Sequence, residues 1–335
     1  MKVGAGAPPN EQGAGVVRAA VASWLAAYAA PADPLIIACS GGADSLALAV
    51  STHDVIAGAA HDRRLVGATV DHQLQPGSAD RAGATAARLA DIGYRQIEVL
   101  TVNVAGPGGP EAAARHARYD ALLQLARRVG APDRPAAVLL AHTADDQAET
   151  VLLGLARGSG PRSIAGMRAW RAPWGRPLLA VRRADTEQTC HRAGLAPWQD
   201  PHNSDPAFTR VRLRREVLPL LDDVVGGGVR PALARTAELM AQDLDALDVI
   251  AATALDQAGR PDGSLDIATL RRQPDAIVGR VLRAWASAGG SGPLTFDHLR
   301  RMSAQVTADD GPRQVRIPGL LDVVSDGRTL RLERQ

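Results

Sequence analysis

The sequence contains very little lysine and cysteine. Among its 335 residues the one lysine is Lys2, and the cysteines are Cys39 and Cys190. Two distant cysteines without C-x-x-C spacing argue against a disulfide or metal pair and favour reduced thiols in a cytoplasmic protein. No apolar run reaches the roughly 20 residues that a membrane span needs. Residues 16–30 are interrupted by Arg18 and repeat large side chains at helical spacing, so we expect a packing helix there rather than a signal peptide.

Net charge is also low. The formal charge at pH 7 is +2, and hydrophobic residues make up 46% of the chain. This composition is typical of a globular protein, and the length favours two domains over one. Because the overall charge is so close to zero, any nucleic-acid contact must be sought in how the basic residues are distributed along the chain.

The rest of the chain is organised around LIIACSGGADSLAL, residues 35–48. An apolar strand at 35–39 is followed by a turn of small residues and by a helix that begins near Asp44 or Ser45. Adjacent glycines allow positive φ and a close approach of a ligand, and the free amides of a helix N-terminus bind anions. The pattern predicts a phosphate-binding turn. An ordinary strand-to-helix turn capped by Asp44 or Ser45 is the alternative.

The kind of phosphate loop follows from what the chain lacks. A GxxxxGK[ST] loop needs a lysine, which is absent after Lys2, and a GxGxxG loop needs separated glycines. The string SGGADS instead resembles the SGGxDS pyrophosphate loop of the ATP pyrophosphatases, which split ATP between its α and β phosphates and adenylate a substrate. This resemblance implies that ATP is bound by Ser40, Gly41, Gly42, Ala43, Asp44 and Ser45.

Apolar strands alternate with helices along the first half of the chain. Strands are predicted at 35–39, 65–70, 96–102 and 137–141, and helices at 79–92, 111–129 and 145–156. This alternation predicts an α/β fold with a doubly wound parallel sheet. Ligands of such sheets bind at the carboxyl ends of the strands. We therefore expect one site lined by residues 40–45, Asp71, His72, the loop before Glu111, and residues 142–149.

The segment HTADDQAET, residues 142–150, places three carboxylates at the start of a predicted helix. A capping box of Thr143 and Asp146 explains one of them. Glu149 lies one helical turn from both Asp145 and Asp146, and like charges at this spacing cost roughly a few tenths of a kcal/mol per pair. A cation would remove this cost. The spacing therefore predicts Mg²⁺ or a substrate amine beside these side chains.

Four segments together resemble a single family. The strings HTADDQAET, RGSG at 157–160, EAAARHARY at 111–119 and RVRLR at 210–214 are similar to segments of the bacterial tRNA(Ile)-lysidine synthases, in the family's order. The resemblance covers about residues 35–221 and implies an adenine nucleotide alpha-hydrolase-like fold. The chain departs from the family pattern at Val211, where asparagine is usual, and at Thr69, where a histidine is expected.

The resemblance implies a ligase that uses ATP to adenylate C2 of the wobble cytidine, position 34, of the isoleucine tRNA with a CAU anticodon. Free L-lysine then displaces AMP to give lysidine. Catalytic residues would be Asp44, Asp146, Glu149 and Arg115, with Mg²⁺ held by Asp44. Other ATP contacts would come from Asp71, His72 and His142. Substrate contacts would come from Asp145, Asp146, Glu149, Arg118, Arg157, Arg210 and Arg214. For Arg115 or Arg118 alone, a solvated helix face is an equal alternative.

Positive charge is concentrated between Arg157 and Arg215, where twelve arginines accompany four acidic residues. Trp170, Trp174 and Trp198 are interleaved with them. Basic side chains suit a phosphate backbone, and aromatic faces suit an unstacked base, so the stretch as a whole predicts contact with an anticodon loop. Each tryptophan taken alone fits a core position better.

The domain organisation is predicted from the glycines of DDVVGGGVR. Residues 1–221 would form the catalytic domain, 222–230 a linker, and 231–335 a mainly helical tRNA-binding domain. In that second domain we expect helices at 231–258, 276–288 and 295–307, and a hairpin of 314–317 with 329–332.

Two other functions compete with lysidine synthesis. A tRNA cytidine thiolase of the same superfamily would need cysteines for sulfur or a cluster, and Cys39 and Cys190 are poorly placed for that. A non-catalytic ATP-binding or RNA-binding module would have no use for the three crowded carboxylates. The sequence leaves open the oligomeric state, with a homodimer as one alternative, and which carboxylate contacts lysine and which the metal.

Overall fold

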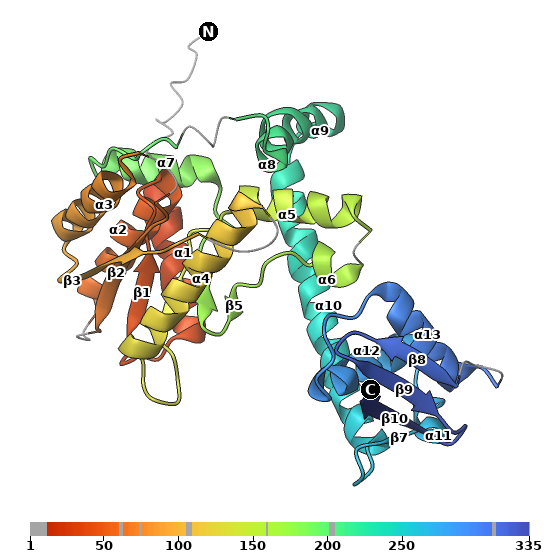
Figure 1. Ribbon diagram of the computed structural model, residues 1–335. Helices are drawn as coiled ribbons and strands as arrows, with labels where there is room; N and C mark the ends of the chain where they lie inside the picture. Colours follow the sequence, from red (N-terminus) through yellow and green to blue (C-terminus); the bar gives the residue numbers. More distant parts are fainter. Residues whose placement is uncertain are drawn as a thin grey trace. The chain divides into compact units, whose positions relative to one another are not determined.

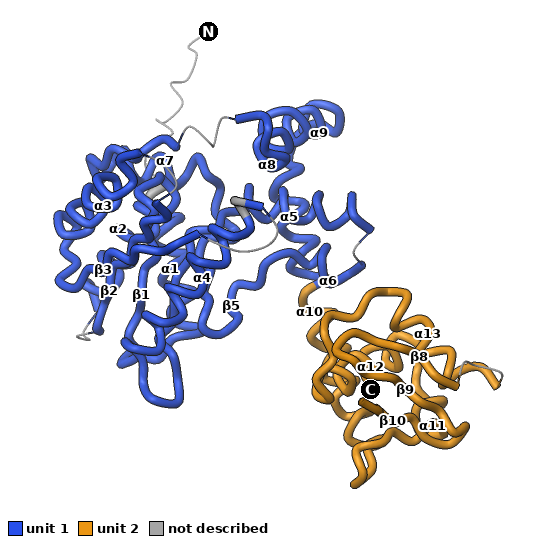
Figure 2. Tube along the Cα trace, in the orientation of Figure 1, with its two compact units in different colours: residues 1–240 blue, residues 241–335 orange. Residues whose placement is uncertain are grey.

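The structure is a computed structural model that describes residues 12–59, 63–73, 76–104, 109–158, 160–200, 205–309 and 313–334. It contains two compact units, residues 1–240 and 241–335 (Figure 2). The first unit begins with elements that alternate between helix and strand (Figure 1): α1 Gln12–Tyr28, β1 Leu35–Ala38, α2 Ala43–Ala57, β2 Leu65–Asp71, α3 Ser78–Ile92, β3 Gln96–Thr101, α4 Pro110–Val129, β4 Ala137–Leu139 and α5 Ala144–Ala156. It continues with α6 Pro161–Ile164, β5 Trp170–Arg171, β6 Trp174–Gly175, α7 Arg183–Arg192, α8 Thr209–Arg212, a π-helical turn Leu213–Val217, α9 Leu218–Val225 and the start of α10 Val229–Ala258.

The sheet of this unit has the strand order β3-β2-β1-β4-β6-β5. All neighbouring pairs are parallel except the edge pair of β5 with β6. The predicted parallel α/β fold is confirmed. The edge pair was not predicted, because strands of two residues carry no periodic signal.

Helices cover both faces of the sheet, and β1 shows how the sequence encodes this. Leu35 and Ile37 are buried against α1, α2 and α7, whereas Ile36 is buried against Leu122 and Leu125 of α4. A strand covered on both faces needs a continuous apolar run, because successive side chains point to opposite faces. Each such side chain contributes about 1.5–3 kcal/mol by its burial. The result is a rigid strand that ends directly at the phosphate turn.

The predicted helix at 16–30 is present as α1. Its residues Val17, Val21 and Trp24 are buried in the same cluster as Leu35, so the helix is part of the core of the first unit. Within the described residues, no helix has the length and apolar character that crossing a membrane requires.

Three consecutive glycines connect α9 to α10. Gly226, Gly227 and Gly228 have φ values of 78°, 93° and 79°, which non-glycine residues rarely adopt. The glycines therefore make a tight turn, whereas residues 222–225 and 229–230 of the predicted linker are helical. The division between the two compact units falls later, after Met240. It lies inside α10, because that helix continues for 30 residues without a break.

The second unit combines helices with a four-stranded antiparallel sheet. Its elements are the end of α10, β7 Leu265–Asp266, α11 Ile267–Leu270, α12 Asp275–Ala288, α13 Phe296–Thr307, β8 Gln314–Ile317, β9 Leu321–Ser325 and β10 Thr329–Arg334. The strand order is β7-β10-β9-β8. The expected direct hairpin of 314–317 with 329–332 is wrong, because β9 lies between these strands and pairs with both. The sheet packs on α12 and α13 through residues such as Val278, Leu282, Val306, Val323 and Leu330.

Candidate active site

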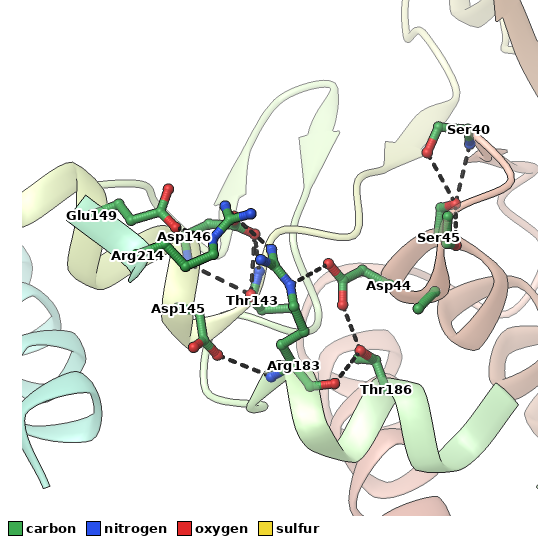
Figure 3. Close-up of polar contacts among 12 residues, drawn as sticks. Ser40, Asp44, Ser45, Thr143, Asp145, Asp146, Glu149, Arg183, Thr186 and Arg214 are labelled. Carbon is green, nitrogen blue, oxygen red and sulfur yellow. Dashed lines mark hydrogen bonds and ion pairs between the residues drawn. The ribbon is translucent and has the colours of Figure 1, made fainter. Parts of the chain in front are cut away.

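The phosphate turn lies at the carboxyl end of β1, and Ser45 organises it. Its Oγ accepts a hydrogen bond from the Ser40 amide at 3.1 Å and donates one to the Gly42 carbonyl at 2.9 Å (Figure 3). The Ser40 hydroxyl lies 3.3 Å from the same oxygen. The first amides of α2 have no partner within the helix and carry its positive dipole end, as an anion requires. The geometry fits the predicted phosphate loop.

Gly41 is needed for the shape of this turn. Its φ is +81°, and a Cβ there would lie 2.7 Å from Oγ1 of Thr85 on α3. The Gly41 carbonyl accepts a hydrogen bond from the Trp198 amide at 2.9 Å, and the Trp198 ring lies under the Arg81 guanidinium. The loop is therefore held from both sides by segments distant in sequence.

The second predicted segment starts α5 at the end of β4. Thr143 and Asp146 form the predicted capping box, in which Asp146 Oδ2 accepts from the Thr143 amide at 2.8 Å and the Asp146 amide donates to Thr143 Oγ1. This cap uses Oδ2 of Asp146 and leaves Oδ1 facing Arg183 and Arg214 (Figure 3).

Arginines lie beside the crowded carboxylates, where Mg²⁺ or a substrate amine was predicted. Arg183, the first residue of α7, donates from Nε to Asp44 Oδ2 and from Nη2 to Asp146 Oδ1, both at 3.1 Å. The other oxygen of Asp44 accepts from the Thr186 hydroxyl. The side chains of Asp44 and Asp146 are therefore joined by one guanidinium (Figure 3).

Glu149 has a side chain with no exposed surface and is paired with arginines from the α8–α9 region. Arg214 Nε donates to its Oε1 at 2.7 Å, and Arg210 Nη1 lies 3.6 Å from its Oε2. Arg214 belongs to the π-helical turn Leu213–Val217, a wider turn that is frequent at functional sites. The arrangement brings together Glu149 and the two predicted substrate residues Arg210 and Arg214.

Asp145 faces a different set of partners. Its Oδ2 accepts from the Arg183 backbone amide at 2.9 Å, and its Oδ1 lies 3.0 Å from Arg230 Nε at the start of α10. Arg230 also contacts Asp222 of α9. Asp145 thus holds the backbone of α7 and the start of α10 together.

The carboxylates differ in proton affinity. Burial raises the pKa of Asp44 and of Glu149, and the paired arginines only partly oppose it. Burial also acts on Asp146, but there Arg183 and the Thr143 amide prevail and lower its pKa. Two carboxylates on one helix with pKa values shifted in opposite directions are suited to different tasks, one as a fixed anion and the other as a proton acceptor.

Histidines and arginines also lie near the carboxyl ends of the strands. Among the described residues, buried side-chain nitrogens without a hydrogen-bond partner include His72 Nδ1, His142 Nδ1, Arg118 Nε and Arg176 Nε. Burial lowers the pKa of His142 to about 3, and burial with the Arg118 charge lowers that of His72. Both imidazoles are neutral at pH 7, beside guanidinium groups that suit a phosphate or a base edge. Asp71, whose pKa is lowered by the Gln73 amide, ends β2 nearby.

Arg115 lies on α4, one helical turn before Tyr119. Its guanidinium stacks on the Tyr119 ring and donates to its hydroxyl at 3.3 Å. Arg157 is exposed at the C-terminal end of α5. The described contacts link neither Arg115 nor Arg157 to the carboxylates, and their roles stay predictions.

The arginines of the basic stretch 157–215 include paired and exposed side chains. Arg183, Arg210 and Arg214 pair with carboxylates from outside the stretch, while arginines such as Arg171 and Arg192 are exposed. Two of the tryptophans pack against ring systems of the first unit: Trp170 against Trp24 and Tyr28, and Trp174 against Tyr119. Both are partly buried and pack against the core clusters of the first unit.

Sequence reasoning missed Arg183 and Thr186 as site residues. Their carboxylate partner Asp44 is 139 and 142 positions away, so no local spacing marks them. The two departures from the family pattern are both buried: Thr69 within β2 and Val211 within α8.

Comparisons with known proteins agree with this geometry. The chain matches the PP-loop domain over residues 17–221 and the TilS substrate binding domain over residues 265–335. A tRNA(Ile)-lysidine synthase of Rhodococcus opacus (strain B4) is 50% identical over 93% of this chain and 91% of its own. A tRNA(Ile)-lysidine synthase of Mycobacterium tuberculosis (strain CDC 1551 / Oshkosh) is 47% identical over 95% of this chain and 92% of its own. Among solved structures, the U34-tRNA thiolase NcsA from Methanococcus maripaludis has a TM-score of 0.56 at 15% identity, over 69% of this chain and 80% of its own, which shows a shared fold.

The parallel sheet, the SGGADS turn and the matched domain define a PP-loop enzyme that uses ATP. Within that class, identity near 50% over most of the chain is decisive, and the chain belongs to the tRNA(Ile)-lysidine synthase family. The family assignment confirms the resemblance seen in the sequence and favours it over a thiolase. Both cysteines are buried, and among the described residues neither belongs to a group of three side chains able to hold a metal.

Proposed function

We propose that this enzyme adenylates C2 of cytidine 34 in the CAU-anticodon isoleucine tRNA and joins L-lysine to it, which changes the codon and amino-acid identity of that tRNA. The cytidine O2 attacks the α-phosphate and pyrophosphate leaves. The lysine Nε then attacks C2, the C2–O bond breaks, and AMP leaves. The observation that carries the proposal is that Asp44, beside the phosphate loop, and Asp146, beside Glu149, are bridged by one side chain. The two half-reactions thus share one site.

In the ATP subsite, the backbone of residues 40–45 binds the pyrophosphate part of ATP. Asp44 is the one acidic side chain of this loop, and the described residues contain no group of three His, Cys, Asp or Glu side chains able to hold a metal. A site with a single carboxylate fits Mg²⁺, which commonly keeps waters and substrate phosphates as its other ligands. When bound, the ion would reduce the charge that opposes attack on the α-phosphate. His72 and His142 contact the nucleotide as neutral groups.

In the lysine subsite, Asp146 and Glu149 have separate tasks. Asp146, whose pKa is lowered, stays ionised and binds the ammonium. Glu149, whose pKa is raised by burial, accepts the proton that the amine loses before it attacks. Arg214 orients Glu149, and Asp145 fixes the surrounding backbone. This assigns lysine to Asp146 and Glu149 of α5 and the metal to Asp44.

The tRNA contacts the exposed arginines of the first unit, including Arg157, and the substrate-binding domain of residues 265–335. Arg115 and Arg118 face the cytidine or its phosphate. We propose that the reaction takes place in the cytoplasm, where ATP, lysine and tRNA are present, and that the enzyme acts as a homodimer. Sedimentation velocity measures that last point directly.

The test is incubation with ATP, Mg²⁺, radiolabelled L-lysine and unmodified CAU-anticodon isoleucine tRNA, following label in RNA and AMP release together. We expect lysine-dependent label at cytidine 34. Glu149→Gln should lose lysine incorporation by about 10²-fold or more, as for other general bases, while pyrophosphate release continues. Glu187→Gln, which changes an exposed carboxylate of α7, is the matched control and should leave the rate unchanged. AMP release on RNA without lysine incorporation would retain the ATP pyrophosphatase class and exclude lysine as the nucleophile.

A further inference from the structure

Arg183 lies between the proposed ATP subsite at Asp44 and the proposed lysine subsite at Asp146. The oxygen atoms of Asp44 are both engaged, Oδ1 by Thr186 and Oδ2 by Arg183. Asp146 uses Oδ2 for its cap on Thr143, so Oδ1 is the oxygen left for a ligand. Arg183 Nη2 donates to this oxygen at 3.1 Å, whereas Arg214 Nη2 lies farther away, at 3.6 Å. A lysine ammonium must therefore compete with Arg183 for the same oxygen.

The backbone of Arg183 is fixed while its side chain has room to move. Its amide donates to Asp145 Oδ2, and it is the first residue of α7, so the Cα position is set by the helix. The side chain is 24% exposed and therefore borders solvent. A change of rotamer can take the guanidinium away from Asp146 without moving any helix.

We propose that Arg183 is a displaceable counter-ion that keeps the lysine subsite closed until ATP is bound. This inference rests on the proposed function. A triphosphate at residues 40–45 carries more negative charge than Asp44, and the planar, permanently charged guanidinium suits a phosphate with two parallel hydrogen bonds. Arg183 turns from Asp146 to the phosphates, and Oδ1 of Asp146 becomes available to lysine. ATP therefore binds before lysine, and Arg183 afterwards lies beside the α-phosphate at which adenylation occurs.

The consequence is a measurable coupling between the two ligands. Lysine should bind more tightly when the nucleotide is present, and by linkage the nucleotide should bind more tightly when lysine is present, by the same factor. The experiment is calorimetric titration of L-lysine into the full-length enzyme, with and without Mg²⁺ and α,β-methylene-ATP, which cannot be cleaved between the α and β phosphates. For the wild type we expect about 10-fold tighter lysine binding with the analogue, within the usual range of such couplings.

Two substitutions at neighbouring positions separate this role from general charge effects. In Arg183→Gln, lysine should bind the nucleotide-free enzyme more tightly than it binds nucleotide-free wild type. The ratio of the lysine dissociation constants measured without and with the ATP analogue should then fall towards one. Arg182→Gln is the matched control, since Arg182 is 67% exposed and pairs with Asp185. It should keep the wild-type ratio. If Arg183→Gln does not fold, Arg183→Lys retains the charge without the two-pronged contact, and its ratio should lie below that of wild type.

Equal lysine affinity with and without the analogue in wild type would overturn the role of Arg183 while leaving lysine as the substrate. An undiminished ratio in Arg183→Gln, or in Arg183→Lys where that variant is the folded one, would overturn it too. Absence of lysine binding to wild type under both conditions would overturn the proposed function itself, and with it the inference.

Discussion

Arg214 and Glu149 form an ion pair inside the protein, with Nε of the arginine 2.7 Å from Oε1 of a carboxylate that has no exposed surface. Loss of one partner leaves a buried charge. We expect Arg214→Met to lower the free energy of unfolding by about 3 kcal/mol, as is usual when a buried pair is broken from one side. The double variant Glu149→Gln/Arg214→Met should regain most of the lost stability, because the charges of both partners are then absent. Urea unfolding followed by circular dichroism measures both values.

The control for this prediction lies two residues earlier in the chain. Arg212 pairs with Glu216 at 2.9 Å, but the two side chains are 61% and 50% exposed. Water already solvates both charges, so Arg212→Met should leave the free energy of unfolding close to the wild-type value. Equal losses in Arg212→Met and Arg214→Met would show that burial of Glu149 has no energetic consequence.

The phosphate turn should tolerate alanine at one glycine and not at the next. Gly41→Ala places a Cβ against Thr85 at a φ of +81°, and the backbone conformation alone costs about 1–2 kcal/mol. Gly42 has a φ of −77°, and the nearest atom to its Cβ would be 3.7 Å away. We expect Gly41→Ala to lower stability and weaken nucleotide binding, and Gly42→Ala to fold with wild-type stability. Thermal unfolding compares the stabilities of the two variants, and titration with a fluorescent ATP analogue compares their nucleotide binding. Similar stabilities would show that the loop can change its conformation.

These features also show which parts of the site can be predicted from the sequence. The apolar run Leu35–Ala38 and the spacing of Thr143 and Asp146 act over a few residues, so the strand and the capping box follow from local pattern. Arg183 could not be assigned this way. Its partners are 139 and 37 positions distant, and only the folded sheet brings them together. The sequence predicts Mg²⁺ or a substrate amine beside the acidic cluster, whereas the side chains that lie there in the structure are arginines.

His142 should make the protein sensitive to acid. Burial lowers its pKa to about 3 in the folded state, compared with 6.5 for the ordinary imidazole. Between these values the unfolded chain binds a proton that the folded protein does not, so the free energy of unfolding falls as pH falls, by about 1 kcal/mol per pH unit. His142→Gln should lose less stability than wild type between pH 6.5 and 4.5. His116→Gln removes an exposed histidine of α4 and should follow the wild-type curve. Parallel curves for wild type and His142→Gln would contradict the shifted pKa.

Arg157 should contribute to tRNA affinity without contributing to chemistry. It is exposed at the C-terminal end of α5, and the described residues include no carboxylate paired with it. Each arginine that neutralises a phosphate adds about one to the slope of log affinity against log salt, because it releases bound counterions. We expect Arg157→Ala to bind tRNA more weakly at 100 mM salt and to reduce that slope by about one, while single-turnover lysine transfer at saturating enzyme is unchanged. Arg127→Ala is the control, since Arg127 is exposed in the last turn of a different helix, α4. If both variants alter the slope equally, the RNA does not distinguish α5 from α4. If neither variant alters the slope, the proposed contact of α5 with tRNA is wrong.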